Sequence, residues 1–267
     1  MEQEKGRYLY GVAASERATR LGPLGIEGRD VYTITYEDFC AIVHNCPNEP
    51  YQSNDEEIVK SWVSAHQGVL DEAKERFGVV IPFGFDTILQ PGDEATSPDQ
   101  VVKDWLKGDY ERLRSIMKKI RDRDEYGVQI FYKPSLIGRQ IAEQSQEIQK
   151  LKAEIAMKSP GMAYIYRQDL EKVAKAEMEK LADSWFKDCY GRIRPDCDDI
   201  VIEKTRKADG DRVMLLNLSC LVHKEKVDSL GRGLEEINNM DGFSVHFSGP
   251  WPPYSFVAKA VVPVKGE

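Results

Sequence analysis

Apolar positions along the chain follow two spacings, one typical of strands and one typical of helices. In the first half, short runs rich in valine, isoleucine, tyrosine and threonine predict strands at 7–13, 31–35, 39–44, 79–89 and 127–133. Two stretches with apolar residues three and four positions apart predict helices between these strands. A sheet with both helices on one face is the simplest arrangement that buries the two apolar stripes, and it approaches the ferredoxin-like plan.

Polar residues mark the ends of these two helices. Ser53 and Glu56 form a capping box at the start of the first helix, and Gly78 is a typical C-terminal residue for it. Ser97 as N-cap and Pro98 in the first turn predict the start of the second helix, whose buried face extends to residue 120. The two helices are therefore expected at about 54–77 and 98–120.

The last third of the chain repeats the mixed pattern. Strands are predicted at 200–205 and 213–222, joined by a hairpin turn at Asp209-Gly210. A helix is predicted over 227–237 and a final strand over 243–247. This order of elements predicts a second ferredoxin-like domain.

The middle of the chain is helical. Residues 134–158 carry a short seam of two heptads, at Ile141, Gln144, Ile148, Leu151 and Ile155. Such a helix either packs on its own chain or binds a partner helix. Ser159-Pro160-Gly161 ends it, and Tyr164–Tyr166 fits either a further helix or a short strand.

The predicted fold class is therefore α+β, with two ferredoxin-like α/β sandwich domains joined by long helices. We expect an N-terminal domain over 1–133 and a helical hairpin or connector over 134–190. A C-terminal domain over 191–267 is expected to carry a tail rich in proline and aromatic residues.

Composition and charge exclude several classes of protein. The 267 residues are 41% hydrophobic, an ordinary globular value, and the formal net charge of −8 argues against a general nucleic-acid binder. No run of eighteen apolar residues is present, so no membrane span is expected. The polar N-terminus does not resemble a secretory signal, and a cytoplasmic protein is expected.

No motif for catalysis or cofactor binding is found. The chain has no phosphate loop, no dinucleotide fingerprint and no nucleophile elbow, and its five cysteines do not predict a disulfide framework. Cys40, His44 and Cys46 are the densest set of possible metal ligands, but a zinc site needs a fourth ligand that is not visible. We therefore expect half-buried cysteines, an edge histidine, and a satisfied core or boundary histidine at His66. Catalytic residues, metal ions and cofactors are not expected.

The most unusual segment lies near the C-terminus, where Ser248–Phe256 holds three prolines and three aromatic residues. Proline restricts the backbone, and aromatic side chains supply large contact areas. The segment either folds back on its own domain as a rigid lid or presents a surface to a partner. The candidate partner-binding residues are Trp251, Pro252, Pro253, Tyr254 and Phe256.

Gly249–Val257 resembles the C-terminal motif of the gas vesicle protein F and L family. Three other segments resemble the family in the expected order, namely Tyr8–Val12, Gly127–Ile130 and Ser159–Tyr164. The chain departs from the family within Pro82–Thr87, where glycine replaces a usual arginine and aspartate replaces a usual glycine. A role for that arginine therefore does not transfer to this chain.

The resemblance implies a non-enzymatic accessory or minor structural protein of gas vesicles, the hollow protein shells of some bacteria and archaea. The implied partners are the small hydrophobic shell protein and other accessory proteins during assembly. The Trp251–Phe256 segment and the Pro134–Trp185 helices are the expected contacts. The alternative is a ligand-sensing binding module of paired ferredoxin-like domains, because fold does not determine function. A third hypothesis is an enzyme whose site is built from Cys40, His44 and nearby carboxylates.

Overall fold

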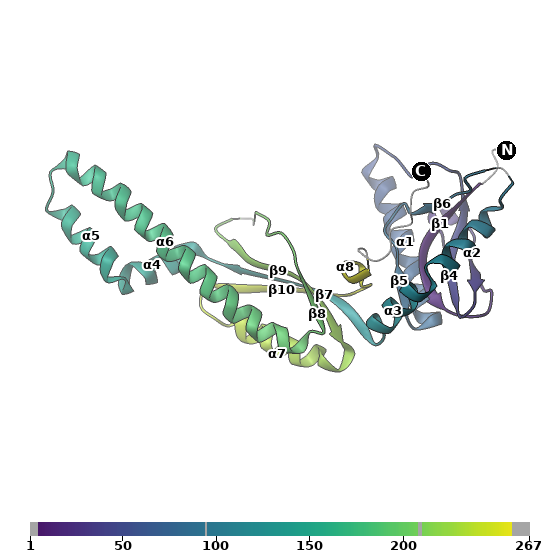
Figure 1. Ribbon diagram of the computed structural model, residues 1–267. Helices are drawn as coiled ribbons and strands as arrows, with labels where there is room; N and C mark the ends of the chain where they lie inside the picture. The colour runs from purple at the N-terminus through teal and green to yellow at the C-terminus, as the bar shows by residue number, and fades with distance from the viewer. Residues whose placement is uncertain (1–4, 94, 208–209, 258–267) are drawn as a thin grey trace. The chain divides into compact units, whose positions relative to one another are not determined.

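The computed structural model describes residues 5–93, 95–207 and 210–257, and its contacts divide the chain into two compact units. Unit 1 comprises Met1–Glu125 together with Pro250–Glu267, and unit 2 comprises Tyr126–Gly249 (Figure 1). Both units combine helices with β-sheet, which confirms the α+β class. No helix within the described ranges has both the length and the apolar character needed to cross a bilayer.

The sheet of unit 1 has the strand order β2-β3-β4-β1-β5, with the short β6 also paired to β1. Its strands are β1 (Gly6–Ala14), β2 (Arg20–Gly22), β3 (Val31–Tyr36), β4 (Phe39–Cys46), β5 (Val80–Pro82) and β6 (Ile88–Leu89). Strand β1 lies antiparallel to β4, β5 and β6, so it is the centre of the sheet. Gly11 of β1 is packed tightly, because a Cβ there would lie 2.9 Å from the carbonyl oxygen of Ile81.

Helices cover both faces of this sheet. Helix α1 (Glu56–Phe77) packs on the face that carries Tyr8 and Tyr10, whereas α2 (Pro98–Gly108) and α3 (Tyr110–Ile120) pack on the face that carries Leu9. The prediction of both helices on one face is therefore wrong. The physical reason is that β1 and β4 are apolar on both faces, and each face must be buried. The element order of unit 1 also differs from the β-α-β-β-α-β plan.

The ends of the helices in unit 1 follow local hydrogen bonding. The N-cap of α1 is Asp55, whose carboxylate accepts the amide N–H of Glu57 at 2.9 Å, so the capping box expected at Ser53 is wrong. Gly78 ends α1 with φ of 80°, as predicted. Ser97 caps α2 with Pro98 in its first turn, also as predicted, but the expected single helix is divided at Asp109 into α2 and α3.

Unit 2 contains a four-stranded sheet in the order β10-β7-β9-β8. Its strands are β7 (Arg123–Tyr132), β8 (Asp199–Ile202), β9 (Val213–His223) and β10 (Phe243–Trp251). Its helices are α4 (Pro134–Gln144), α5 (Gln146–Ala156), α6 (Pro160–Ile193) and α7 (Val227–Asn238). Of the predicted hairpin turn before β9, Gly210 has φ of +74°, and Asp209 lies outside the described residues.

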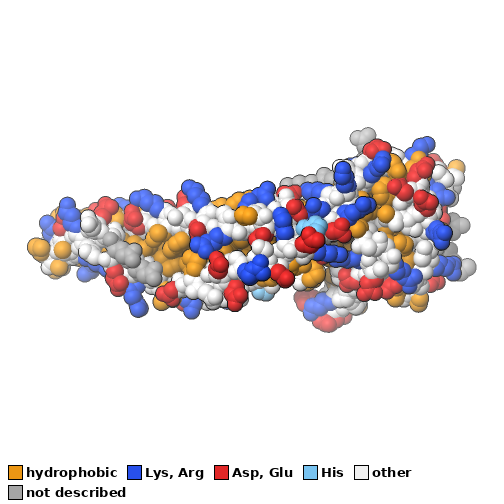
Figure 2. All heavy atoms as spheres, turned by 90° about the horizontal axis from the view of Figure 1, so that it is seen from below, with side chains coloured by type: hydrophobic (Ala, Val, Ile, Leu, Met, Phe, Trp, Pro, Cys, Tyr) orange, Lys and Arg blue, Asp and Glu red, His pale blue; other side chains and the backbone are white. Residues whose placement is uncertain are grey.

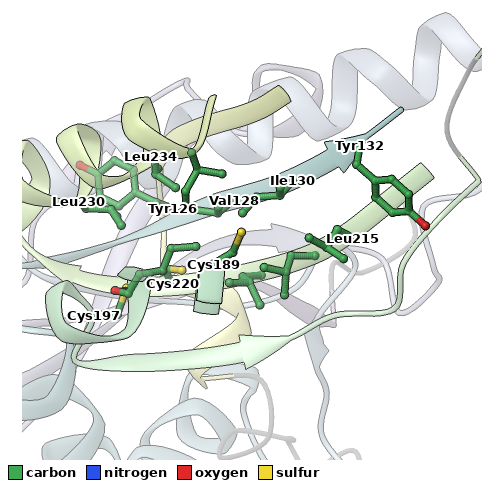
Figure 3. Close-up of a cluster of buried hydrophobic side chains, with 14 of the residues drawn as sticks. Tyr126, Val128, Ile130, Tyr132, Cys189, Cys197, Leu215, Cys220, Leu230 and Leu234 are labelled. Carbon is green, nitrogen blue, oxygen red and sulfur yellow. The ribbon is translucent and has the colours of Figure 1, made fainter. Parts of the chain in front are cut away.

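One core holds unit 2 together. Val128 and Ile130 of β7, Cys220 of β9 and Leu230 of α7 are buried in it, together with Cys189 near the end of α6 (Figure 3). Short helical turns complete the connections, at η1 (Ile26–Gly28) in unit 1 and at η2 (Arg194–Asp196) and η3 (Lys224–Lys226) in unit 2. Because α6 shares a core with the sheet, the helices after residue 134 belong to the same compact unit as the strands that follow.

Helices α5 and α6 form a hairpin in unit 2 (Figure 1). The seam residues Ile141 and Ile148 are buried in the unit 2 core, so this face packs on its own chain. The chain turns at Ser145, which is the N-cap of α5. Its Oγ accepts a hydrogen bond from the amide N–H of Ile148. Tyr164–Tyr166 lies within α6, which decides between the two readings of that segment in favour of helix.

The units differ from the expected domain boundaries. Residues 134–190 were expected as a separate connector, yet they group with 191–249. The tail after residue 249 was expected with the C-terminal domain, yet Pro250–Val257 groups with unit 1. The cause is contact between this tail and buried groups of unit 1.

Candidate functional site

The C-terminal segment, Pro250–Val257, groups with unit 1, and its first two residues are also the last two of strand β10. It ends in the short helix α8 (Tyr254–Val257), which contacts β5. The side chains of Phe256 and Val257 are buried, and Val257 joins the core cluster that contains Ile81. The Nζ atom of Lys119 lies 5.6 Å from the centre of the Phe256 ring. Most of the motif is therefore anchored by apolar burial.

Two hydrogen bonds to a carboxylate also anchor the segment. The amide N–H of Ser255 donates to one carboxylate oxygen of Glu125 at 2.9 Å, and the Ser255 hydroxyl donates to the other at 2.6 Å. Glu125 is buried, with 8% of its surface exposed. A buried carboxylate is costly unless its oxygens accept hydrogen bonds, so this contact stabilises the attachment of the segment.

Replacing Ser255 with alanine is expected to lower the free energy of unfolding by about 1.5–3 kcal/mol, the usual cost of losing a hydrogen bond to a charged group. Urea unfolding at neutral pH measures this change. Ser61→Ala is the matched control, because the Ser61 hydroxyl is exposed on α1 and bonds only the carbonyl of Ile58 within the described residues. Equal stability of the two variants would contradict the anchoring role of Ser255.

Tyr254 connects the segment to a buried histidine, His66 of α1. The hydroxyl of Tyr254 lies 3.3 Å from His66 Nε2, and the same nitrogen lies 3.1 Å from the carbonyl oxygen of Phe83. Because a carbonyl only accepts, Nε2 carries the proton. His66 Nδ1 therefore accepts from the Tyr8 hydroxyl at 2.9 Å, and that hydroxyl in turn accepts the amide N–H of Asp86.

His44 of β4 has an equivalent set of partners. Its Nδ1 lies 2.7 Å from the hydroxyl of Tyr10, and its Nε2 lies 3.1 Å from the hydroxyl of Tyr51. The Tyr10 hydroxyl accepts the amide N–H of Ile26, so its own proton is directed to His44 Nδ1. The two sets meet through ring contacts, because the Tyr8 ring stacks on His44 and lies 4.8 Å from the Tyr10 ring. We call them together the histidine–tyrosine core, which consists of Tyr8, Tyr10, His44, Tyr51, His66 and Tyr254.

Burial keeps the histidine–tyrosine core uncharged. Loss of water lowers the pKa of His44 to about 3 and the pKa of His66 to about 4. Loss of water also raises the pKa of Tyr254, and it raises the pKa of Tyr51 to about 12. Both histidines are therefore uncharged at neutral pH, and each ring nitrogen faces a protein group. The arrangement is suited to packing and orientation and presents neither histidine to a substrate.

Cys40, His44 and Cys46 share one face of β4, but they do not form a metal site. All three side chains are fully buried, so the expectation of half-buried cysteines and an edge histidine is wrong. The reason is that α1 covers this face of the sheet. Burial raises the thiol pKa of both cysteines to about 11. Among the described residues, no group of three histidine, cysteine or acidic side chains is placed to hold a metal ion.

The candidate residues of the C-terminal segment separate into two sets. Pro253 and Phe256 are buried on unit 1 and Tyr254 reaches His66, whereas Pro252 is half-buried and Trp251 remains 50% exposed. Sequence reasoning missed Glu125 as the partner of this segment. Glu125 lies 130 positions from Ser255 in the sequence, and no local pattern indicates the pair.

Comparison with known proteins gives the family. The family described as gas vesicle synthesis protein GvpL/GvpF matches residues 6–258, nearly the whole chain. The chain belongs to the GvpL/GvpF family. The resemblance of the chain to the gas vesicle protein F and L family is thereby confirmed.

Relatives of both types occur in the GvpL/GvpF family. Gas vesicle protein L1 of Halobacterium salinarum is 28% identical, with 94% of this chain and 90% of that protein covered. Gas vesicle protein F1 of the same organism is 23% identical, with 94% and 92% covered. The crystal structure of GvpF from Anabaena sp. PCC7120 matches with a TM-score of 0.74 at 18% identity, covering 94% of this chain and 98% of that one. The fold is therefore that of a known gas vesicle protein.

Proposed function

We propose that this chain is a non-enzymatic accessory or minor structural protein of gas vesicles. In this proposal it acts in the cytoplasm and binds the hydrophobic shell protein and other accessory proteins during vesicle assembly. Membership of the GvpL/GvpF family supports the role in gas vesicle formation. The strands of unit 2 have the spatial order β10-β7-β9-β8, and the element order is β-α-β-β-α-β when α4, α5 and α6 together count as the first connection. This arrangement supports describing the unit as ferredoxin-like.

The observation that carries the binding role is the half-exposed indole of Trp251. It belongs to a segment whose following residues are fixed on unit 1 by Ser255 and Phe256. A large aromatic side chain on a pre-organised backbone loses little conformational entropy on binding, and tryptophan is enriched among residues that dominate binding energy. The proposed contact is therefore Trp251 with the adjacent Pro252.

Replacing Trp251 with alanine is expected to weaken capture of the co-expressed shell protein at least about tenfold, corresponding to a loss of about 1.4 kcal/mol or more. A pull-down from cells that co-express both proteins measures the captured shell protein. The matched control is Ile58→Ala on α1, because Ile58 is a comparably exposed apolar residue at 42%. Circular dichroism establishes that each variant is folded.

The variant Tyr254→Phe separates contact with the shell protein from attachment of the segment to unit 1. It removes the hydroxyl near His66 and keeps the aromatic ring. Capture by Tyr254→Phe at the wild-type level, together with loss in Trp251→Ala, supports the proposal. Unchanged capture by Trp251→Ala refutes the assigned contact. Absence of capture by the wild-type chain refutes direct binding of the shell protein.

A further inference from the structure

The turn between α5 and α6 carries several exposed apolar side chains. We call residues 150–167 the hairpin tip. Within it Met157 is 82% exposed and Tyr164 is 63% exposed, and Met162 and Ile165 are about half exposed. Met162 and Ile165 are three positions apart in α6, so they are neighbours on the helix surface. Figure 1 shows the tip at the end of the hairpin away from the four-stranded sheet of unit 2.

The same region is basic, unlike the chain as a whole. The hairpin tip contains four basic residues and one acidic residue, so its formal charge is +3 in a protein whose formal charge is −8. The four basic side chains, all exposed, are Lys150, Lys152, Lys158 and Arg167. Residues 134–149 and 168–185 on either side carry formal charges of −1 and −2. The positive charge is therefore confined to the tip.

Basic and apolar groups are interleaved at the tip. Lys158 Nζ lies 5.2 Å from the centre of the Tyr166 ring, and Lys158 directly follows Met157 in the sequence. Figure 2 shows hydrophobic side chains with lysine and arginine side chains beside them on the helical part of unit 2. Methionine adapts its shape to a partner, and lysine stems extend an apolar surface while their ammonium groups stay in water.

We propose that the hairpin tip docks an amphipathic helix of a partner protein, with the apolar face of that helix bordered by aspartate or glutamate. The apolar face covers Met157, Met162 and Ile165, and the carboxylates lie opposite Lys152 and Lys158. Charge complementarity selects this occupant over a helix with basic flanks. The identity of the partner as a gas vesicle protein rests on the proposed function, whereas the chemistry of the surface does not.

Two synthetic amphipathic helices with the same leucine face, one flanked by glutamate and one by lysine, test the proposal. We expect the full-length protein to bind the glutamate-flanked helix about tenfold more tightly than the lysine-flanked helix, measured by fluorescence anisotropy, with the preference decreasing at high salt.

The double variant Lys152→Glu/Lys158→Glu is expected to lose this preference. Met162→Ser/Ile165→Ser is expected to weaken both helices. The control Lys103→Glu/Lys107→Glu changes two exposed lysines on α2 of unit 1 and is expected to behave as wild type.

Several results would overturn the proposal. These are equal binding of the two helices, binding of neither, or unchanged binding by the tip variants when circular dichroism shows them folded. Binding to vesicles of anionic lipid without binding to the glutamate-flanked helix would assign the tip to a lipid surface. Loss of a dimer in the tip variants, measured by light scattering, without helix binding would assign it to a second copy of the chain. The shell-protein pull-down is read separately, so its failure with intact helix binding refutes only the proposed function.

Discussion

His44→Leu is expected to lower the free energy of unfolding by about 2–4 kcal/mol. Leucine fills most of the volume but accepts no hydrogen bond, so the Tyr10 hydroxyl loses the acceptor 2.7 Å away and the Tyr51 hydroxyl loses its partner at 3.1 Å. Each buried polar group left without its partner costs about 1–3 kcal/mol. Urea unfolding followed by tryptophan fluorescence measures the change.

The matched control is His246→Leu, the same substitution at an exposed position of β10. A change within about 0.5 kcal/mol is expected there, as for ordinary surface substitutions. If His44→Leu were as stable as this control, the hydrogen bonds of the histidine–tyrosine core would contribute nothing to folding, and the interpretation of His44 as a structural residue would be wrong.

Acidification from pH 7.5 to pH 5 is expected to cost about 2 kcal/mol of unfolding free energy for each buried histidine. The pKa of His44 is about 3 and that of His66 about 4 in the folded chain, both below the ordinary value of 6.5. At pH values between the folded pKa of each histidine and 6.5, the unfolded chain binds more protons than the folded chain. The stabilisation is therefore present above pH 6.5 and is lost as the pH falls towards 4 for His66 and towards 3 for His44.

Urea unfolding across this pH range measures the effect, and His66→Gln isolates one of the two contributions. Glutamine keeps a donor for the carbonyl oxygen of Phe83 but does not titrate, so the variant is expected to lose about half of the pH-dependent change. A pH dependence identical to that of the wild type would show that His66 is not the responsible group.

Much of the fold could be predicted from local signals. Gly78 and Ser97 mark helix ends through backbone hydrogen bonding that needs only neighbouring residues. The division of the second helix at Asp109 was not predictable, because the apolar stripe continues on both sides of it. The two-sided sheet was missed although β1 and β4 are apolar at nearly every position, a pattern that indicates burial on both faces.

The candidate site was predictable only in part. The composition of the C-terminal segment indicated a special role, but its attachment depends on Glu125 and His66, which are far away in the sequence. Likewise, the spacing of Cys40, His44 and Cys46 gave the correct shared face without indicating that Tyr10 and Tyr51 occupy the two nitrogens of His44. Such pairings depend on tertiary structure, which a single sequence does not reveal.

The return of Pro250–Val257 to unit 1 has a consequence for biosynthesis. Unit 2 is an insertion within unit 1, since all of residues 126–249 are made between the two parts of unit 1. At about 5–20 residues per second, a ribosome needs roughly 6–25 s to translate that insertion. During this interval Glu125 lacks Ser255, and β5 lacks the apolar cover of Val257. Maturation of the N-terminal fold is thus coupled to translation of residues 250–257, and chains that terminate before these residues retain an incomplete first domain.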